Sequence, residues 1–247
     1  MKVRLSKLFR LVAVPSVILV TLAVQLPACA GLFSVTPVRI YMTSKDRAVA
    51  VTLTNEGDSE IALQADIYTW TQQPDGTDSM VLTEDLLLSP PIIKLAPRAR
   101  QVVRLAMLAP RDATRQMTYR MIMREVPELT PAKDKSIQVP IALALNMPVF
   151  VTPPVAKREV SCEVKRVDAK TLQVLCSNTG TAYAQIREVV LKRGDQQLAR
   201  FEGGNYILPG ARKTISMKST QEAGPGEAEL TVTFDDSQSQ TAVVTLP

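Results

Sequence analysis

The chain has 247 residues, of which 46% are hydrophobic, 4% aromatic and 21% charged, and it contains no histidine. The lack of histidine excludes Ser-His-Asp triads, Cys-His dyads and nearly all catalytic zinc sites, and no glycine-rich phosphate loop occurs. The sequence therefore predicts a protein without enzymatic activity, bound metal or cofactor.

The first thirty residues have the pattern of a cleavable secretory signal. A basic segment precedes an apolar run over 11–26, and Ala28 and Ala30 supply small residues where signal peptidase cleaves. The run is short for a membrane span, and no basic stop-transfer cluster follows it. We predict export to the periplasm with cleavage near Ala30. An uncleaved anchor and a lipoprotein acylated at Cys29 are the alternatives.

Removal of that segment changes the charge balance. The chain has 29 basic and 24 acidic residues, and four of the basic ones lie in the first thirty residues. The remaining 25 basic residues nearly balance the 24 acidic ones. A net charge near +1 does not support a surface for nucleic acid, so we expect no nucleic-acid partner.

Two cysteines, Cys162 and Cys176, remain after cleavage. In an oxidising compartment an even pair predicts a structural disulfide. The alternative, a redox-active pair, is disfavoured because the spacing differs from Cys-x-x-Cys.

From Phe33 onward the chain alternates between apolar and polar residues in short runs separated by turn residues. In the first half the expected strands cover 48–54, 61–70, 101–107 and 119–126. No stretch keeps a period of 3.6 for long, so little helix is expected. Strands at this spacing are typical of a β-sandwich.

Pro153 and Pro154 interrupt this pattern, because two prolines cannot continue a central strand. A second set of expected strands covers 159–167, 172–176, 186–192, 230–234 and 241–246. We therefore predict an all-β protein with a signal at 1–30 and two sandwich domains, at 31–152 and 153–247, joined by a stiff, angled connector.

The segment before the two prolines carries the longest alternating pattern. Every second residue from Ile137 to Val151 is apolar, and Pro140 and Pro148 stand among the intervening residues. Because proline cannot donate to a ladder, one flank of this strand is expected at a sheet edge. Two interpretations remain open. The apolar row is core, or part of it faces outward to receive a partner strand.

Several blocks, in this order and spacing, resemble the PapD-like periplasmic pilus chaperones along nearly the whole exported chain. These blocks are 89–97 with 101–105, the segment Tyr119–Pro127 ending in Glu-Val-Pro, 141–143, and 206–212. The resemblance implies two immunoglobulin-like domains arranged as a boomerang. It also implies that the last strand of the first domain completes the fold of a pilus subunit that lacks its own final strand.

The resemblance further implies which residues are donated and to whom. The side chains expected to fill the subunit's groove are Ile137, Val139, Ile141, Leu143 and Leu145. The expected partners are pilus subunits and an outer-membrane usher, and the apolar row makes a self-capping homodimer plausible.

The family holds the subunit's C-terminal carboxylate with an arginine and a lysine, and Arg39 falls on the arginine position. A guanidinium suits this task because it binds a carboxylate with two donors and stays charged. Pro148 stands where the family has its lysine, and Arg120 on the neighbouring strand is our hypothesis for a substitute. The departure indicates the archaic or spore-coat-type subgroup. The alternative for Arg39 is a surface salt bridge.

Four charged residues match another family feature, an interdomain salt-bridge network that fixes the angle between domains. These residues are Arg104, Glu125, Asp235 and Asp236. A secreted structural or adhesive surface protein is the alternative function, and it explains the signal and the fold only.

Overall fold

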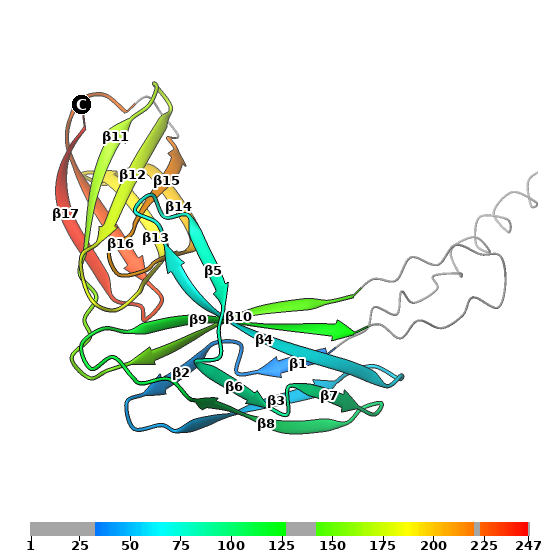
Figure 1. The fold of residues 1–247 in the computed structure, drawn as a ribbon. Helices are drawn as coiled ribbons and strands as arrows, with labels where there is room; N and C mark the ends of the chain where they lie inside the picture. The colour runs from blue at the N-terminus through cyan, green and yellow to red at the C-terminus, as the bar shows by residue number, and fades with distance from the viewer. Residues whose placement is uncertain (1–32, 127–141, 220–222, 247) are drawn as a thin grey trace, which may run out of the picture.

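The computed structural model describes residues 33–126, 142–219 and 223–246. Within these ranges all regular secondary structure is β-strand. Figure 1 shows two sandwiches set at an angle, as expected for a boomerang. The all-β class with two immunoglobulin-like sandwiches is thus confirmed. In the part of the chain that the structure describes, no helix has the length and apolar character to cross a membrane.

The first sandwich consists of two sheets. One has the order β1 (Phe33–Thr36), β3 (Ala48–Asn55), β8 (Arg100–Met107), β6 (Leu86–Ser89). The other has the order β2 (Ile40–Thr43), β10 (Ala144–Thr152), β9 (Met117–Val126), β4 (Ile61–Gln72), β5 (Asp78–Leu82), with β7 (Ile92–Leu95) also paired to β4.

Side chains at period two join these sheets. Val51 and Leu53 on β3 are fully buried, whereas the threonine between them is half-buried. Tyr119, Met121 and Met123 on β9 are buried in the same way. Because successive residues of a strand point to opposite faces, the two inner faces meet in one apolar core.

The chain changes sheets between β1 and β2. β1 pairs antiparallel with β3, whereas β2 pairs parallel with β10 in the opposite sheet. Pro37 lies between them and has no N–H with which to extend the first ladder. The crossing places Arg39 directly before β2, at the end of the sandwich that contacts the second domain.

The second sandwich follows a connector over 153–159. One sheet has the order β11 (Val160–Arg166), β12 (Thr171–Asn178), β15 (Arg212–Lys218). The other has the order β14 (Gln196–Ile207), β13 (Ala184–Arg193), β16 (Gly226–Phe234), β17 (Ser239–Leu246). Their inner faces enclose a separate apolar core.

A disulfide joins Cys162 to Cys176 and confirms the expected pairing. The two cysteines are direct partners in the ladder between β11 and β12. The bond closes a loop of 14 residues, which in the chain-entropy model contributes about 3 kcal/mol by restricting the unfolded chain.

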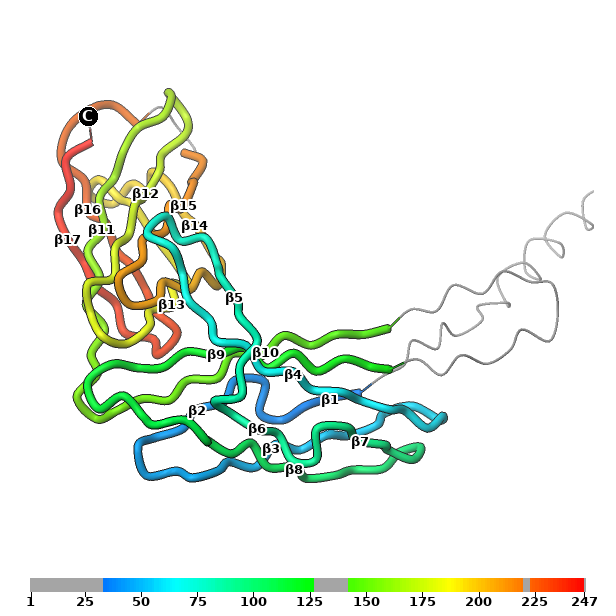
Figure 2. The backbone as a smooth tube through the Cα atoms, viewed as in Figure 1, coloured from blue at the N-terminus to red at the C-terminus, as the bar shows by residue number. Residues whose placement is uncertain are grey.

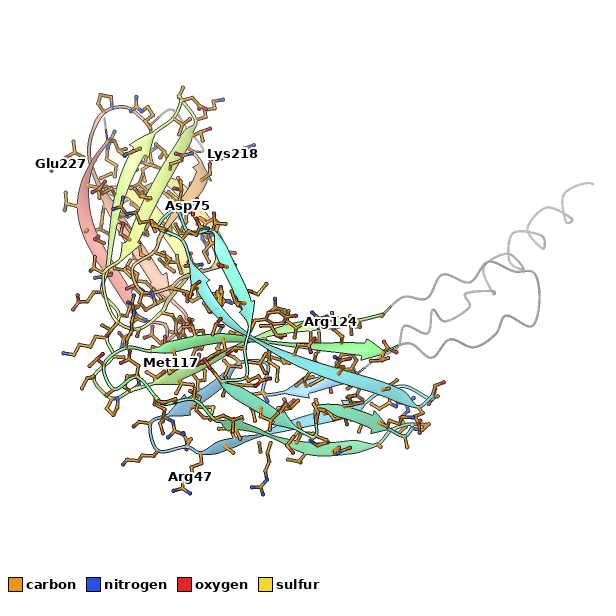
Figure 3. The ribbon with its side chains drawn as sticks, viewed as in Figure 1. Arg47, Asp75, Met117, Arg124, Lys218 and Glu227 are labelled. Carbon is orange, nitrogen blue, oxygen red and sulfur yellow. A yellow bond between two sulfur atoms is a disulfide. The ribbon has the colours of Figure 1, made fainter. Side chains whose placement is uncertain are left out.

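The β4–β5 hairpin of the first sandwich reaches the second. Figure 2 shows this hairpin rising from the first sandwich toward β14, and Figure 3 labels Asp75 in its turn. The Gln72 side chain donates to the carbonyl of Tyr206 (3.2 Å) and accepts from the N–H of Leu208 (2.8 Å). These bonds hold the hairpin against the second domain.

The tip of the same hairpin requires glycine. Gly76 has a φ of 83°, and its carbonyl accepts a hydrogen bond from Lys213 Nζ at 3.1 Å. A Cβ at this position would lie 2.2 Å from the carbonyl oxygen of Arg212. Only glycine permits both the backbone conformation and this close approach.

Candidate functional site

The two halves of β10 have different neighbours. β9 pairs with β10 along its length, from Ala144 to Val151. β2 covers the other side only from Val149 to Thr152. Among the residues that the structure describes, no strand pairs with the second side of β10 over 144–148. This half is an open strand edge, and its end at Pro148 lies opposite Arg120, which contacts Tyr206 of the second domain.

The hydrogen-bond pattern shows which backbone groups face that edge. The N–H of Glu125 donates to the carbonyl of Leu143 at 2.9 Å, so residue 143 directs its backbone groups toward β9. In an antiparallel ladder the direction alternates along the strand. Ala144 and Asn146 therefore direct N–H and C=O toward the open edge. Pro148 follows in the same phase, so its missing N–H costs the ladder nothing.

The apolar row of this segment changes from buried to exposed along the strand. Met147, Val149 and Val151 are 3%, 0% and 2% exposed and belong to the first core. Leu145 is half-buried against the same core, and Leu143 is 39% exposed. The row is therefore core from Met147 onward, whereas its described beginning at Leu143 is exposed. The expected donor residues Ile137, Val139 and Ile141 lie outside the described residues.

The other face of β10 contributes to an aromatic cluster between the domains. Phe150 is fully buried and stacks on Tyr183 of the second domain, with ring centroids 4.0 Å apart. Trp70 from β4 meets Tyr206 from β14 edge-to-face at 5.2 Å, and Tyr41 stacks on Phe150 at 5.7 Å. Aromatic pairs of this kind each add about 0.5–1.5 kcal/mol beyond area burial, so the cluster stabilises the angle between the sandwiches.

Arg39 reaches from the first domain to the second. Its Nη1 donates to Asp235 Oδ2 at 2.5 Å and to the Tyr41 hydroxyl at 3.1 Å. Its Nη2 donates to Gln185 Oε1 at 2.6 Å. Tyr183 also donates to Asp235 Oδ2 (2.8 Å), and burial together with the hydrogen bonds of its hydroxyl with Tyr41 and Asp235 raises the pKa of the Tyr183 phenol. Arg39 therefore forms an interdomain ion pair.

Arg120 lies on the same side of the first domain, and none of the residues that the structure describes forms an ion pair with it. It is the cross-strand neighbour of Pro148, so its side chain shares the face on which the family lysine is expected. Its guanidinium carbon is 3.6 Å from the centroid of Trp70 and 5.4 Å from that of Tyr206. Burial lowers the pKa of this arginine. Arg39 is 5.7 Å from the same Tyr206 ring, so both cations lie beside one aromatic side chain of the second domain.

The expected salt-bridge network needs correction. Asp235 and Asp236 do form ion pairs, but with Arg39 and with Arg158 (3.0 Å). Glu125 lies at the far end of β9, whose first residues adjoin the second domain. Eight residues of strand separate it from that end, roughly 26 Å at 3.3 Å per residue. This distance prevents an ion pair with either aspartate.

Arg104 does not take part in an interdomain salt bridge, for a different reason. It lies on β8, opposite Ala50 and Ser89, in the sheet that does not contain Trp70 or Arg120. Its side chain is exposed, and it forms no ion pair with Asp235 or Asp236.

Sequence reasoning did not identify the full set of residues around Arg39. Gln185, Tyr183 and Tyr41 bind the same arginine–aspartate pair, and none had been singled out for this role. Arg39 and Asp235 are 196 residues apart, and no local pattern marks them as partners. Within the described ranges, no cluster of three or more histidine, cysteine or acidic side chains is placed to hold a metal ion.

The chain shows similarity to known proteins at the level of family and of fold. The model of the family described as "Pili and flagellar-assembly chaperone, PapD N-terminal domain" matches residues 32–157. No curated protein matches the sequence at a significant level.

Three solved structures illustrate the likeness in fold. A chain in the CsuC–CsuE chaperone–tip adhesion subunit complex from archaic chaperone-usher Csu pili of Acinetobacter baumannii matches with a TM-score of 0.63 and 16% identity, over 88% of this chain and 100% of that one. The E. coli chaperone DraB matches at 0.56 and 15%, over 87% and 95%. A chain in the SafA pilin–SafB chaperone complex of Salmonella enterica matches at 0.56 and 12%, over 87% and 96%.

Proposed function

This chain belongs to the pili and flagellar-assembly chaperone family, and from that premise we propose that it binds pilus subunits by lending them a β-strand and delivers them to an outer-membrane usher. On this proposal the first part of β10, together with the segment before it, takes the place of the strand that a subunit lacks. The observation that carries the proposal is the open edge of β10 over 144–148.

An open edge beside an apolar row is what strand addition needs. Ala144 and Asn146 offer backbone groups to a partner strand, and the exposed Leu143 offers a side chain. Backbone hydrogen bonds then supply affinity, and apolar side chains supply specificity. Burial of each aliphatic side chain contributes roughly 1.5–3 kcal/mol before association costs. Ile137, Val139, Ile141 and Leu145 extend the same row in the sequence.

Arg39 and Arg120 support a second contact of the same complex, with the subunit's C-terminal carboxylate. Both guanidinium groups lie within 6 Å of the Tyr206 ring, at the end of β10 from which a partner strand would run. A guanidinium stays charged when half-buried and presents several donors to a carboxylate. Arg120 takes the place of the family lysine that is absent at Pro148.

The proposal includes the compartment and the domain limits. The signal pattern at 1–30 directs the chain to the periplasm. There the first domain, 31–152, donates the strand, and the second, 153–247, contributes Tyr206 and Asp235 beside the two arginines. The free protein is expected to cover its apolar row by forming a capped dimer, which dissociates when a subunit binds.

Co-purification tests the function. The tagged mature protein is expressed in its own periplasm, purified, and the bound proteins are identified by mass spectrometry. We expect small β-rich pilus subunits with the unmodified protein. We expect none with an Ile141→Asp, Leu143→Asp variant. Burying two carboxylates in the subunit's groove is unfavourable by more free energy than strand addition contributes.

A matched control separates binding from folding. Val167→Asp, Val243→Asp introduces the same charges at second-domain residues that are 56% and 72% exposed. Thermal unfolding must be the same for both double variants. Subunits that remain bound to the Ile141→Asp, Leu143→Asp variant, or the absence of subunits from the unmodified protein, contradict strand donation.

A further inference from the structure

Arg39 holds an internal carboxylate in the free protein. Asp235 lies 2.5 Å from its Nη1, and the side chains of the pair are 27% and 11% exposed. Gln185 and Tyr41 take two further N–H groups of the same guanidinium. Of five donors on an arginine, three are therefore occupied by residues of this chain. A subunit carboxylate that reaches Arg39 meets a cation whose charge is already balanced.

Arg120 differs from Arg39 both in its charge balance and in the occupation of its donors. No residue that the structure describes forms a hydrogen bond or ion pair with its guanidinium, which instead stacks on Trp70 at 3.6 Å. Asp78 is bound to the indole N–H of Trp70 and acts on Arg120 only at a distance. Burial removes water from this cation and lowers its pKa. Within the described residues, none of the five donors of Arg120 is therefore occupied by another group of this chain.

We propose that Asp235 is an internal competitor that lowers the affinity of the two arginines beside Tyr206 for a C-terminal carboxylate, and that Arg120 is the residue that binds this carboxylate first. The proposal rests on the function proposed above and assigns unequal roles to the two arginines. Asp235 holds Arg39 across the domain boundary, and a bound subunit must share or displace it. This weakens retention of the subunit, which suits a protein that has to release what it binds.

The electrostatics give the sign of the effect. With Asp235 ionised, the charges of Arg39 and Asp235 cancel, and Arg120, whose charge Asp78 offsets only from a distance, is the cation left for a carboxylate. Asp235→Asn keeps the shape and an acceptor for Tyr183 but removes the negative charge. The site then carries two cations, and attraction to a carboxylate increases. A Coulomb interaction of roughly 1 kcal/mol, the value for two unit charges at 4 Å in water, corresponds to about a fivefold gain in affinity.

Trp70 provides the readout, because it is the only tryptophan of the chain and stacks on Arg120. The full mature protein is titrated at low salt with the N-acetylated hexapeptide Val-Thr-Val-Thr-Val-Thr, as the free acid and as the C-terminal amide. We expect Asp235→Asn to bind the acid at least about fivefold more tightly than the unmodified protein, with the affinity for the amide unchanged.

Asp236→Asn is the matched control. It removes the same charge from the adjacent residue, whose partner is Arg158 rather than Arg39, and we expect affinities equal to those of the unmodified protein. Arg120→Met should abolish the preference for acid over amide. Equal affinity of Asp235→Asn and unmodified protein for the acid, or no preference for the acid in either, overturns the proposal. Subunit co-purification that persists in that case leaves the proposed function standing, so the two failures are distinguishable.

Discussion

The two halves of β10 belong to one strand but have different surroundings. From Val149 to Val151 the strand lies between β9 and β2, and both of its faces are buried, one in the first core and one in the aromatic cluster. From Ala144 to Pro148 it has a neighbour on one side only. The comparison shows how one strand supports two roles, because the buried half fixes the position and register of the open half.

The largest effect is expected in the buried half. Phe150→Ala removes a fully buried ring from the interdomain cluster. We expect a loss of about 3–5 kcal/mol in the free energy of unfolding, the usual cost of a large-to-small change in a core. Urea denaturation followed by circular dichroism measures it. A loss below about 1 kcal/mol would show that the buried half is not what fixes the strand.

In the open half, a substitution should reduce subunit affinity and leave stability nearly unchanged. Leu143→Ala truncates a side chain that is 39% exposed, so the free energy of unfolding should change by less than about 0.5 kcal/mol. Subunit affinity, measured by calorimetry with a purified subunit, should fall about tenfold, because about 1.4 kcal/mol of apolar burial in the complex is lost. If Leu143→Ala instead changed stability and left affinity intact, the two halves would not differ in role.

The smallest effect is a change in the dependence of stability on alkaline pH. Burial, followed by the hydrogen bonds with Tyr41 and Asp235, raises the pKa of Tyr183. A raised pKa in the folded state contributes stability that is complete below the unfolded value, about 10, and is lost as the pH rises above it. Tyr183→Phe should therefore lose less stability between about pH 9 and pH 11, by roughly 1 kcal/mol after allowance for solvent screening.

The variant that adjoins the open half is the reference for this measurement. Leu143→Ala introduces no titratable group, so its pH profile should follow that of the unmodified protein. If the profile of Tyr183→Phe also follows it, the phenol does not link the buried half of β10 to the second domain.

Much of the fold was predictable because alternation is a local property. The expected strands at 48–54, 61–70 and 119–126 correspond to β3, β4 and β9. Short strands such as β6 and β7 have too few residues to establish a period. β14 was missed because Gly203 and Gly204 interrupt its pattern. The disulfide was predictable because only one pairing of the exported cysteines exists.

The candidate site was predictable only in part. The apolar row and Pro148 indicated β10 as the candidate strand, because both features lie within one short segment of the sequence. The partners of Arg39 come from elements far apart in the sequence, and which carboxylate meets which cation depends on the angle between the sandwiches. For this reason Asp235 was expected between the domains, but with Arg104 and Glu125 as partners instead of Arg39.

Hydrogen exchange at single residues of β10 tests the central claim most directly. In the free protein the amides of Ala144 and Asn146 face the open edge, whereas those of Leu145 and Met147 are bonded to β9. We predict fast exchange at Ala144 and Asn146 in the free protein and strong protection in the complex with a subunit, with Leu145 and Met147 protected in both. Amides of Ala144 and Asn146 that exchange as fast in the complex as in the free protein would contradict strand donation at this edge.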